Sequence, residues 1–316
     1  MKVVALAGGV GGAKLADGLA QALPPGDLTI IVNTGDDFAH FGLKICPDLD
    51  TVCYTLAGLA NPAAGWGRSG ETWNALESIK TLGGPSWFNL GDQDLGTHLE
   101  RTRRLNQGHS LSEVTVDFCR AWGIAVQVLP MSDDPVPTWV ESDEGKLPFQ
   151  EYFVRRQCQP RVRGFVFEGV EKASPAPGAL EALHEAGLVV FCPSNPWVSI
   201  DPILSIPGVR EAVRSRPAIA VSPIIGGQTV KGPAAKMYAE LGIQPSALAV
   251  AQHYGASHAG GLLTSFTLDR IDAGQAGLVA SLGMQPFVAE TLMKTPADRL
   301  SLAQTVLDFG FQRRKT

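Results

Sequence analysis

The chain opens with a short apolar run that leads straight into glycines, and this pairing restricts the possible folds more than any other feature. The apolar run is Lys2–Leu6, and the segment Gly8–Lys14 after it reads GGVGGAK. A helical pattern over Ala13–Ala22 and a second apolar, β-branched run over Leu28–Asn33 follow. A strand, a glycine turn, a helix and a second strand make up a βαβ unit, whose strands are parallel.

Apolar runs of the same kind return along the rest of the chain. Their near-continuous apolar character is typical of a parallel sheet that is buried on both faces. We therefore expect an α/β fold with a mostly parallel sheet flanked by helices. The further strands are expected at Ile124–Leu129, Gly164–Phe167, Leu188–Cys192, Ala218–Val221 and Ala247–Ala251.

Helical periodicity and aromatic-rich loops replace this pattern between about Thr51 and Trp122. The change predicts a helical subdomain inserted into the sheet domain. We expect a core made of residues 1–52 and 118–316, and an insertion over residues 53–117.

Composition and charge argue against several classes of protein. The net charge is -5 and no long basic run occurs, so nucleic acid is not an expected partner. No apolar stretch approaches the roughly 18 residues of a membrane span, and the N-terminus lacks the features of a signal peptide. Five cysteines without a CxxC pair fit buried thiols in a reducing compartment, so we expect a cytoplasmic protein. The histidines show no HExxH spacing, and GxSxG is absent.

The first glycine loop is a candidate phosphate site. Gly9, Gly11 and Gly12 let backbone amides approach a ligand closely, and Lys14 and the helix N-terminus add positive charge. The loop matches neither standard motif. Lys14 occupies the position of the third glycine of the dinucleotide-binding motif, and the GK[ST] ending of the Walker motif is absent. The alternative is that the glycines only allow tight packing of the strand on the helix.

Carboxylates gather after the second strand. Asp36 and Asp37 follow Asn33-Thr34-Gly35, and Asp48 and Asp50 lie in PDLDT, with Lys44 as the main opposing charge. So many acids repel one another unless a cation or a proton neutralises them, and Mg²⁺ favours such oxygen ligands together with substrate phosphate. The alternative for Asp48 or Asp50 is a cap of the helix that begins near Thr51.

A second glycine loop, Ser222–Pro233, again follows a strand and precedes a helix. It holds Gly226, Gly227 and Lys231, so it repeats the features of a phosphate site. Asn195, in Ser194-Asn195-Pro196, is expected at the same carboxyl edge of the sheet, where ligands of open α/β sheets bind.

A group of large aromatic residues and a pair of arginines each allow both a structural and a functional interpretation. Trp66, Trp73, Trp87 and Phe88 lie near Asn89–Asp94, and they either pack in a core or form the wall of a site for a flat heterocycle. Arg155 and Arg156 either bind an anion or lie on a solvated helix face.

Taken in order, these segments resemble the 2-phospho-L-lactate transferase family, which builds the deazaflavin coenzyme F-420. The matching stretches are AGGVGGAKL, VNTGDDF, GLKICPDLDTVCYTLAG, ETWNAL, NLGDQDLGTHLER, PMSDDPV, FQEYFVRR, PSNPWVSIDPIL and SPIIGGQTVKGPAAKM. They span nearly the whole chain. Gln93, Gly96 and Pro137 depart from the family pattern.

The resemblance implies a Rossmann-like core with a helical insertion, and a Mg²⁺-dependent transfer of a phospholactyl or related phosphoenolpyruvyl group. The donor would be a guanosine diphosphate conjugate, the acceptor the deazaflavin Fo and the leaving group GMP. A homodimer is expected. The resemblance assigns the residues as follows: catalysis and Mg²⁺ binding to Asp36, Asp37 and Asp50; nucleotide binding to Gly9, Gly11, Gly12, Lys14, Thr34, Asn195, Ser222, Gly226, Gly227 and Lys231; acceptor binding, with the insertion, to Asp48, Trp87, Phe88, Asp92 and Thr97.

Two other functions stay open at this point. One is a non-catalytic, nucleotide-sugar-binding regulatory protein of a sister family with a similar core. The other is a nicotinamide dehydrogenase, which the missing acidic ribose ligand after the second strand disfavours.

Overall fold

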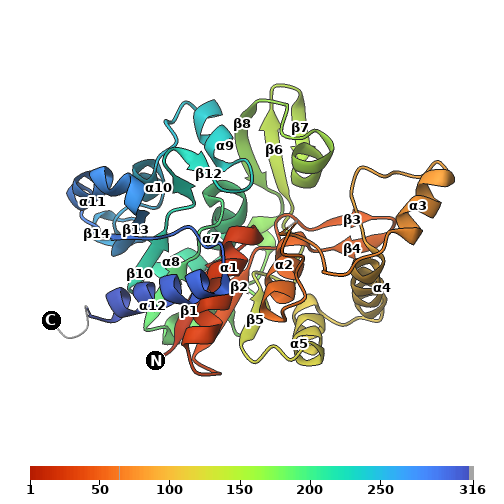
Figure 1. Ribbon diagram of the computed structural model, residues 1–316, viewed down its shortest axis with the longest axis horizontal. Coiled ribbons are helices and arrows are strands. Elements are labelled where there is room, and N and C mark those ends of the chain that lie inside the picture. Colours follow the sequence, from red (N-terminus) through yellow and green to blue (C-terminus); the bar gives the residue numbers. More distant parts are fainter. Residues whose placement is uncertain (64, 313–316) are drawn as a thin grey trace.

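The computed structural model describes residues 1–63 and 65–312, and a seven-stranded parallel sheet lies at its centre (Figure 1). The strand order is β14-β13-β10-β9-β1-β2-β5, with every neighbouring pair parallel. This confirms the α/β, Rossmann-like fold. The strands are β1 (Val3–Ala7), β2 (Leu28–Val32), β5 (Gln127–Pro130), β9 (Leu188–Phe191), β10 (Ala218–Val221), β13 (Ser265–Asp269) and β14 (Gln285–Ala289).

The expected βαβ unit is present at the N-terminus. Strand β1 pairs with β2 in a register that sets Val3 opposite Leu28, and α1 (Gly9–Ala22) connects them. The helix begins at Gly9, earlier than its apolar pattern indicated. The glycines are therefore the first turn of the helix, and their amides lie at its positive end.

The two faces of the sheet are covered by different helices, because successive side chains of a strand point to opposite faces. Val3, Ala5 and Ala7 pack in one core with α1 and α12 (Pro296–Gln312). Val4 and Leu6 pack in a second core on the other face. The helices that contribute to this second core include α6 (Ala179–Glu185), α7 (Asp201–Ser205), α8 (Val209–Arg214) and α10 (Ala247–Tyr254).

The segment between β2 and β5 extends to one side of the sheet in Figure 1. It starts with an antiparallel hairpin and continues as helices. The elements are β3 (Phe38–His40), β4 (Leu43–Ile45), α2 (Pro47–Leu56), α3 (Asn74–Thr81), α4 (Asp92–Asn106) and α5 (Leu111–Ala121). The expected boundaries of the insertion, at residues 53 and 117, stay a prediction; α2 itself packs in the core of the sheet through Leu49 and Val52.

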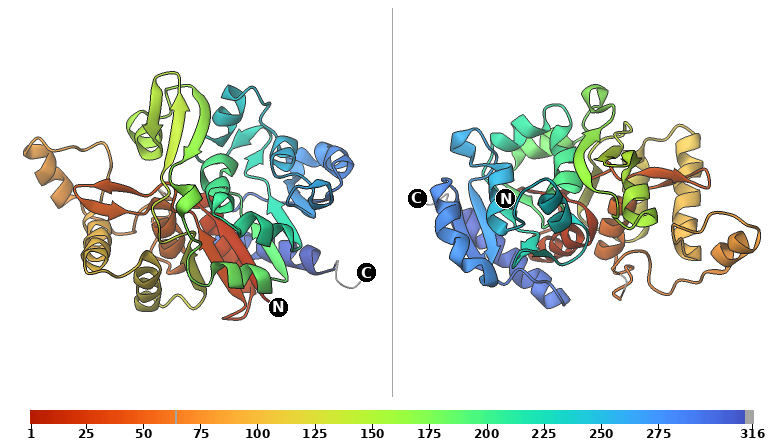
Figure 2. Two further views of the ribbon diagram at one scale, coloured as in Figure 1. Left: turned by 180° about the vertical axis from the view of Figure 1, so that it is seen from behind. Right: turned by 90° about the horizontal axis from the view of Figure 1, so that it is seen from above.

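A small antiparallel sheet stands beside the main one, and the left view in Figure 2 shows it apart from the parallel strands. Its order is β7-β6-β8, with β6 (Thr138–Ser142), β7 (Gly145–Pro148) and β8 (Val162–Phe167). The run Gly164–Phe167 was expected in the parallel sheet, and this placement is wrong. Its strand pairs with β6 instead, and most of its residues are only partly buried.

The expected strand at Ala247–Ala251 is also wrong, because this run lies in α10. Ser246 caps the helix by accepting a hydrogen bond from the Ala249 amide (3.0 Å). A short apolar run surrounded by protein does not distinguish a buried helix from a buried strand. The main sheet is instead completed by β13 and β14, which the sequence reading did not find.

The longest helix among the described residues is α12, with 17 residues. None of the described helices combines the length and the apolar composition that a bilayer crossing demands. The remaining elements are a π-helix at Glu151–Arg155 and another at Pro196–Ile200, β11 (Ile224–Ile225), β12 (Gln228–Thr229), α9 (Ala234–Glu240), α11 (Ala276–Ser281), and short 3-10 turns at Val170–Lys172, Ser257–Ala259 and Arg270–Gln275.

Candidate active site

A cavity of about 600 Å³ lies at the carboxyl ends of the central strands. Ligands of open α/β sheets bind at this edge. The loops that form the cavity come from distant parts of the chain, between residue 8 and residue 293. Its lining includes Gly8, Gly9, Val10, Gly11, Lys14, Asp36, Asp48, Asp50, Tyr54, Trp66, Phe88, Asp94, His98, Phe149, Gln150, Phe153, Ser194, Asn195, Ser199, Ser222, Lys231 and Met293.

The first glycine loop both faces the cavity and packs against neighbouring loops. Gly9 and Gly11 line the cavity, and the Gly9 amide donates to Asp48 Oδ1 at 2.7 Å. A Cβ on Gly11 would lie 2.3 Å from the backbone oxygen of Pro193. A Cβ on Gly12 would lie 2.4 Å from Ser194 Oγ, and Gly12 does not line the cavity. Gly11 and Gly12 thus both have the packing role, while Gly9 and Gly11 line the cavity.

Asp36 and Asp48 form a buried acidic pair in the wall of the cavity. The Asn33 amide group bridges them, donating to Asp48 Oδ2 at 2.9 Å and to Asp36 Oδ1 at 3.4 Å. Burial raises the pKa of Asp48 to about 6. Burial and the nearby charges of Asp48 and Asp37 raise the pKa of Asp36 well above its usual range. Such a site favours a proton or a bound cation.

Asp50 lies two residues further along α2 and is held by an arginine. Its two carboxylate oxygens bind the two terminal nitrogens of Arg101, with Nη1 to Oδ2 at 3.1 Å. Burial raises the pKa of Asp50, and the Arg101 charge opposes this effect. Neither Asp48 nor Asp50 caps α2, because the helix begins at Pro47 with Cys46 before it. The capping alternative is therefore excluded.

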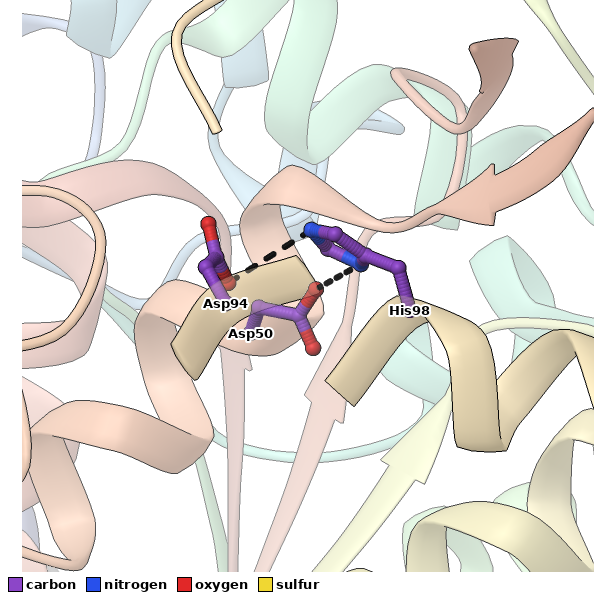
Figure 3. A group of neighbouring side chains, drawn as sticks. All are labelled: Asp50, Asp94 and His98. Atoms are coloured by element: carbon purple, nitrogen blue, oxygen red, sulfur yellow. Dashed lines mark ion pairs between the residues drawn. The ribbon is translucent and has the colours of Figure 1, made fainter. Parts of the chain in front are cut away.

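Asp94 and His98 of α4 lie beside Asp50 (Figure 3). His98 Nδ1 is 3.7 Å from Asp50 Oδ2, and His98 Nε2 is 3.5 Å from Asp94 Oδ1. Asp94 also accepts a hydrogen bond from the Tyr54 hydroxyl at 2.7 Å. Among the described residues, these three side chains are the group whose ligand-type atoms all lie within 4.8 Å of one another.

Asp37 and Thr34 point away from the large cavity. Asp37 forms an ion pair with Lys44 (3.0 Å) and accepts from the Cys46 thiol. Both residues line a separate cavity of about 210 Å³, together with Lys44 and Ser132. The three aspartates expected to serve Mg²⁺ binding and catalysis are therefore not gathered at one point: Asp36 and Asp50 line the large cavity, and Asp37 lines the small one.

Asp36 and Asp48 are the residues that could best hold a divalent cation. Their carboxylates are buried, face one cavity and form no hydrogen bond or ion pair with a cationic group among the described residues. Asp50 fits less well, because the Arg101 guanidinium already balances its charge and would repel a cation. Asp48, expected to contact the acceptor, thus belongs to the acidic pair in this structure.

Cationic groups surround the glycine-loop end of the cavity. Lys14 lines it and donates to the Met293 backbone oxygen at 2.7 Å; burial and the Arg299 and Lys231 charges lower its pKa. From the second loop, Ser222 and Lys231 line the cavity, as does Asn195. Gly226 and Gly227 do not: they form the turn between β11 and β12, where the Gly226 amide donates to Asp272.

Some of the aromatic residues line the wall of the cavity, and others lie outside it. Phe88 lines the cavity, whereas Trp87 packs against Phe38, with ring centroids 5.9 Å apart. Trp66 lines the cavity and is 45% exposed. Trp73 is outside the lining.

The other residues expected at the acceptor have local partners. Asp92 lies at the N-terminal end of α3, where it accepts hydrogen bonds from the Asn74 and Ala75 amides. Thr97 is buried and does not line the cavity. Arg155 and Arg156 pair with Glu151 and Glu144 near the surface, as on a solvated face.

The sequence reading missed the contribution of α4. Asp94, His98 and Arg101 are spaced i, i+4 and i+7, so they share one face of the helix. This spacing was visible in the sequence. Gln150, which donates to Asp36 Oδ2 at 3.1 Å, carried no such signal, because the π-helix that places it is not evident from periodicity.

Comparison with known proteins identifies the family. The family model described as 2-phospho-L-lactate transferase CofD matches residues 3–266. The chain belongs to this family. It is therefore a transferase, with a role in the biosynthesis of coenzyme F-420.

Individual relatives match over almost their full length. A protein named phosphoenolpyruvate transferase from Streptomyces griseus is 44% identical, over 99% of this chain and 100% of its own. One of the same name from Thermobifida fusca is 42% identical, over 100% and 99%. A crystal structure of a upf0052 family member from Bacillus halodurans superposes with a TM-score of 0.62 at 16% identity, over 97% of this chain and 98% of its own, which shows a shared fold.

Proposed function

We propose that this transferase moves a phosphoenolpyruvyl or 2-phospholactyl group from a guanosine diphosphate conjugate to the deazaflavin Fo, and releases GMP. The supporting observation is the composition of one cavity. Glycine backbone, lysines, aromatic rings and buried carboxylates all line it. We further propose a cytoplasmic homodimer.

The donor diphosphate is proposed to bind at the glycine-loop end. Backbone amides at the start of α1 and the side chains of Lys14, Ser222, Asn195 and Lys231 face this part of the cavity. Amides at a helix N-terminus and lysine ammonium groups are the usual partners of phosphate oxygens.

The flat ring system of the acceptor is proposed to lie against the aromatic residues. Phe88, Phe149, Phe153 and Trp66 line the same cavity, and a ring pocket with few polar groups suits a heterocycle. Asp50 and Asp94 lie beside this wall, where they can accept hydrogen bonds from hydroxyl groups of the acceptor.

In the proposed reaction, the terminal ribityl hydroxyl oxygen attacks the phosphorus that carries the acid. The bond from this phosphorus to the bridging oxygen breaks, and GMP leaves with that oxygen. Asp50 accepts the hydroxyl proton. Asp36 and Asp48 would hold Mg²⁺, which supplies charge neutralisation for the diphosphate when bound. Most of the catalysis is then positioning and electrostatic stabilisation.

The names of the relatives bear on the donor's acid. The proteins at 42% and 44% identity are named phosphoenolpyruvate transferases, which favours the enolpyruvyl donor over the lactyl one. Offering both donors to the protein with Fo and Mg²⁺, and weighing the products by mass spectrometry, tests this choice. A product that carries lactate in preference to enolpyruvate would reverse it.

Calorimetry tests the nucleotide. GDP should bind more tightly than ADP, because a site that hydrogen-bonds one base edge strongly rejects a mismatched edge. Lys231→Ala should weaken GDP binding about tenfold through loss of a charge-assisted hydrogen bond. Lys172→Ala, at an exposed lysine outside the cavity, is the matched control. Equal affinity for ADP and GDP would remove the guanosine assignment.

A further inference from the structure

Arg101 is a buried arginine whose side chain contacts the cavity wall without lining the cavity. Only 2% of the residue is exposed. Both terminal guanidinium nitrogens bind the Asp50 carboxylate, in the two-point geometry that fixes a carboxylate's orientation. Asp50 lines the cavity, and Arg101 does not.

Contacts on other sides hold the guanidinium in place. Nη1 also donates to the Lys44 backbone oxygen at 3.3 Å, and the group lies 5.9 Å from the centroid of the Phe118 ring. Arg101 therefore ties Asp50 to β4 and α5 through Lys44 and Phe118, neither of which lines the large cavity.

The same guanidinium begins a row of polar side chains between α2 and α4. Its Nη1 donates to His98 Nδ1 at 3.2 Å, and His98 Nε2 lies 3.5 Å from Asp94 Oδ1 without a hydrogen-bond partner among the described residues. Asp94 in turn accepts from Tyr54, one turn after Asp50 on α2. The row runs from Asp50 through Arg101, His98 and Asp94 to Tyr54.

These contacts explain why Asp50, Asp94 and His98 lie so close together. Asp50 and His98 Nδ1 pair with Arg101 and Asp94 pairs with Tyr54, so among the buried side-chain atoms of these described residues only His98 Nε2 has no hydrogen-bond partner. A guanidinium at hydrogen-bonding distance would also repel a cation at this point. The arrangement of these side chains therefore suits the orientation of the Asp50 carboxylate better than the binding of a metal ion.

We propose that Arg101 is a positioning residue for the transfer reaction: its guanidinium fixes the Asp50 carboxylate in the orientation that receives the acceptor's hydroxyl, without touching either substrate. The inference rests on the proposed function. A lysine cannot replace this arginine, because an ammonium group offers a point charge and not a planar pair of donors.

The first experiment compares Arg101→Lys with wild type. We expect kcat to fall about 10²-fold, as for a misplacement of roughly 1 Å, with the GDP dissociation constant and the KM for Fo unchanged. Arg103→Lys is the matched control, since Arg103 is an exposed arginine on the same helix that pairs with Glu100. Wild-type kcat in Arg101→Lys would overturn the proposal, and so would a loss of GDP affinity in proportion to the loss of rate.

A double variant separates positioning from general damage to the fold. If Arg101 acts only through Asp50, Arg101→Lys should add no further loss of kcat to Asp50→Asn. Losses that multiply would overturn the proposal. Guanidinium chloride should restore at least tenfold of the lost rate to Arg101→Ala, and methylammonium should not; restoration by both cations equally would contradict an orienting role.

A crystal structure of Arg101→Lys gives a readout that does not depend on turnover. The Asp50 carboxylate should be rotated or disordered relative to wild type, and an unchanged carboxylate would overturn the proposal. Wild-type product formation tests the proposed function by itself, because it needs no variant. A failure of the Arg101 proposal can therefore be distinguished from a failure of the proposed function.

Discussion

Two aspartates that line the same cavity differ in their surroundings, and this difference sets opposite expectations for stability. Asp36 has a carboxylate neighbour and no cation, whereas Asp50 balances the buried Arg101. Replacing Asp36 by asparagine relieves repulsion, but replacing Asp50 leaves a buried guanidinium without its partner.

We predict that Asp36→Asn and Asp50→Asn each lower kcat by about 10²-fold or more. Asp36→Asn should leave the free energy of unfolding within about 1 kcal/mol of wild type, and Asp50→Asn should lower it by about 3–5 kcal/mol. Urea denaturation beside a product assay measures both quantities. Near-wild-type turnover in both variants would contradict the proposed site.

The raised pKa of Asp48 predicts a pH dependence of stability in the metal-free protein. Folding shifts this pKa upward, from 3.8 to about 6, so the folded protein binds the proton more tightly than the unfolded chain. The resulting stabilisation is present at low pH and lost as the pH rises from about 4 to about 6.

Asp48→Asn cannot titrate, so its free energy of unfolding relative to wild type should rise by on the order of 2 kcal/mol over this interval. Denaturation of both proteins in chelator at pH 4, 5, 6 and 7 gives the difference. A constant difference would show that Asp48 has an ordinary pKa.

At the scale of elements, the start of α1 depends on close approach to the loop after β9. A Cβ at Gly11 would lie 2.3 Å from the Pro193 backbone oxygen, which cannot rotate away. Gly11→Ala should therefore destabilise the protein by about 1–3 kcal/mol. Gly96, inside α4, has no neighbour within 4 Å of such an atom. Gly96→Ala should stabilise by about 1 kcal/mol through helix propensity, and thermal denaturation compares the two.

The sequence predicted those elements whose signal is local. The apolar run before the glycines identified β1 and α1, because periodicity and turn residues agree there. Ala247–Ala251 gave no comparable signal, since burial on all sides produces the same apolar run in a helix and in a strand. The Ser246 cap was the distinguishing residue.

For the site, the acidic residues and the glycines could be identified from the sequence, but the residues that bind the acidic side chains could not. Arg101 and Gln150 reach the aspartates through folding, across 51 and 114 residues of chain. No pattern in a single sequence encodes such a long-range pair, although the i, i+4, i+7 spacing on α4 marked the face on which one of them lies.

At the scale of the whole molecule, α12 closes the first core against α1. Gly18 allows this contact, because a Cβ there would lie 2.1 Å from the Arg299 backbone oxygen. Leu302, on α12, is 2% exposed, whereas Leu278 on α11 is 53% exposed. Leu302→Ala should lower the free energy of unfolding by about 2–5 kcal/mol, and Leu278→Ala should change it little. Urea denaturation tests this, and similar effects of the two would refute the role of α12 in the core.

The hydrogen bond from Lys14 to the Met293 backbone oxygen has a consequence for synthesis on the ribosome. The glycine loop is among the first segments to emerge, but the wall that faces it arrives some 279 residues later. At a translation rate of about 5–20 residues per second, this interval lasts on the order of tens of seconds. A nascent chain therefore completes this wall of the cavity only late in its elongation. Chains that stop short of residue 293 lack the backbone oxygen that holds the Lys14 ammonium group.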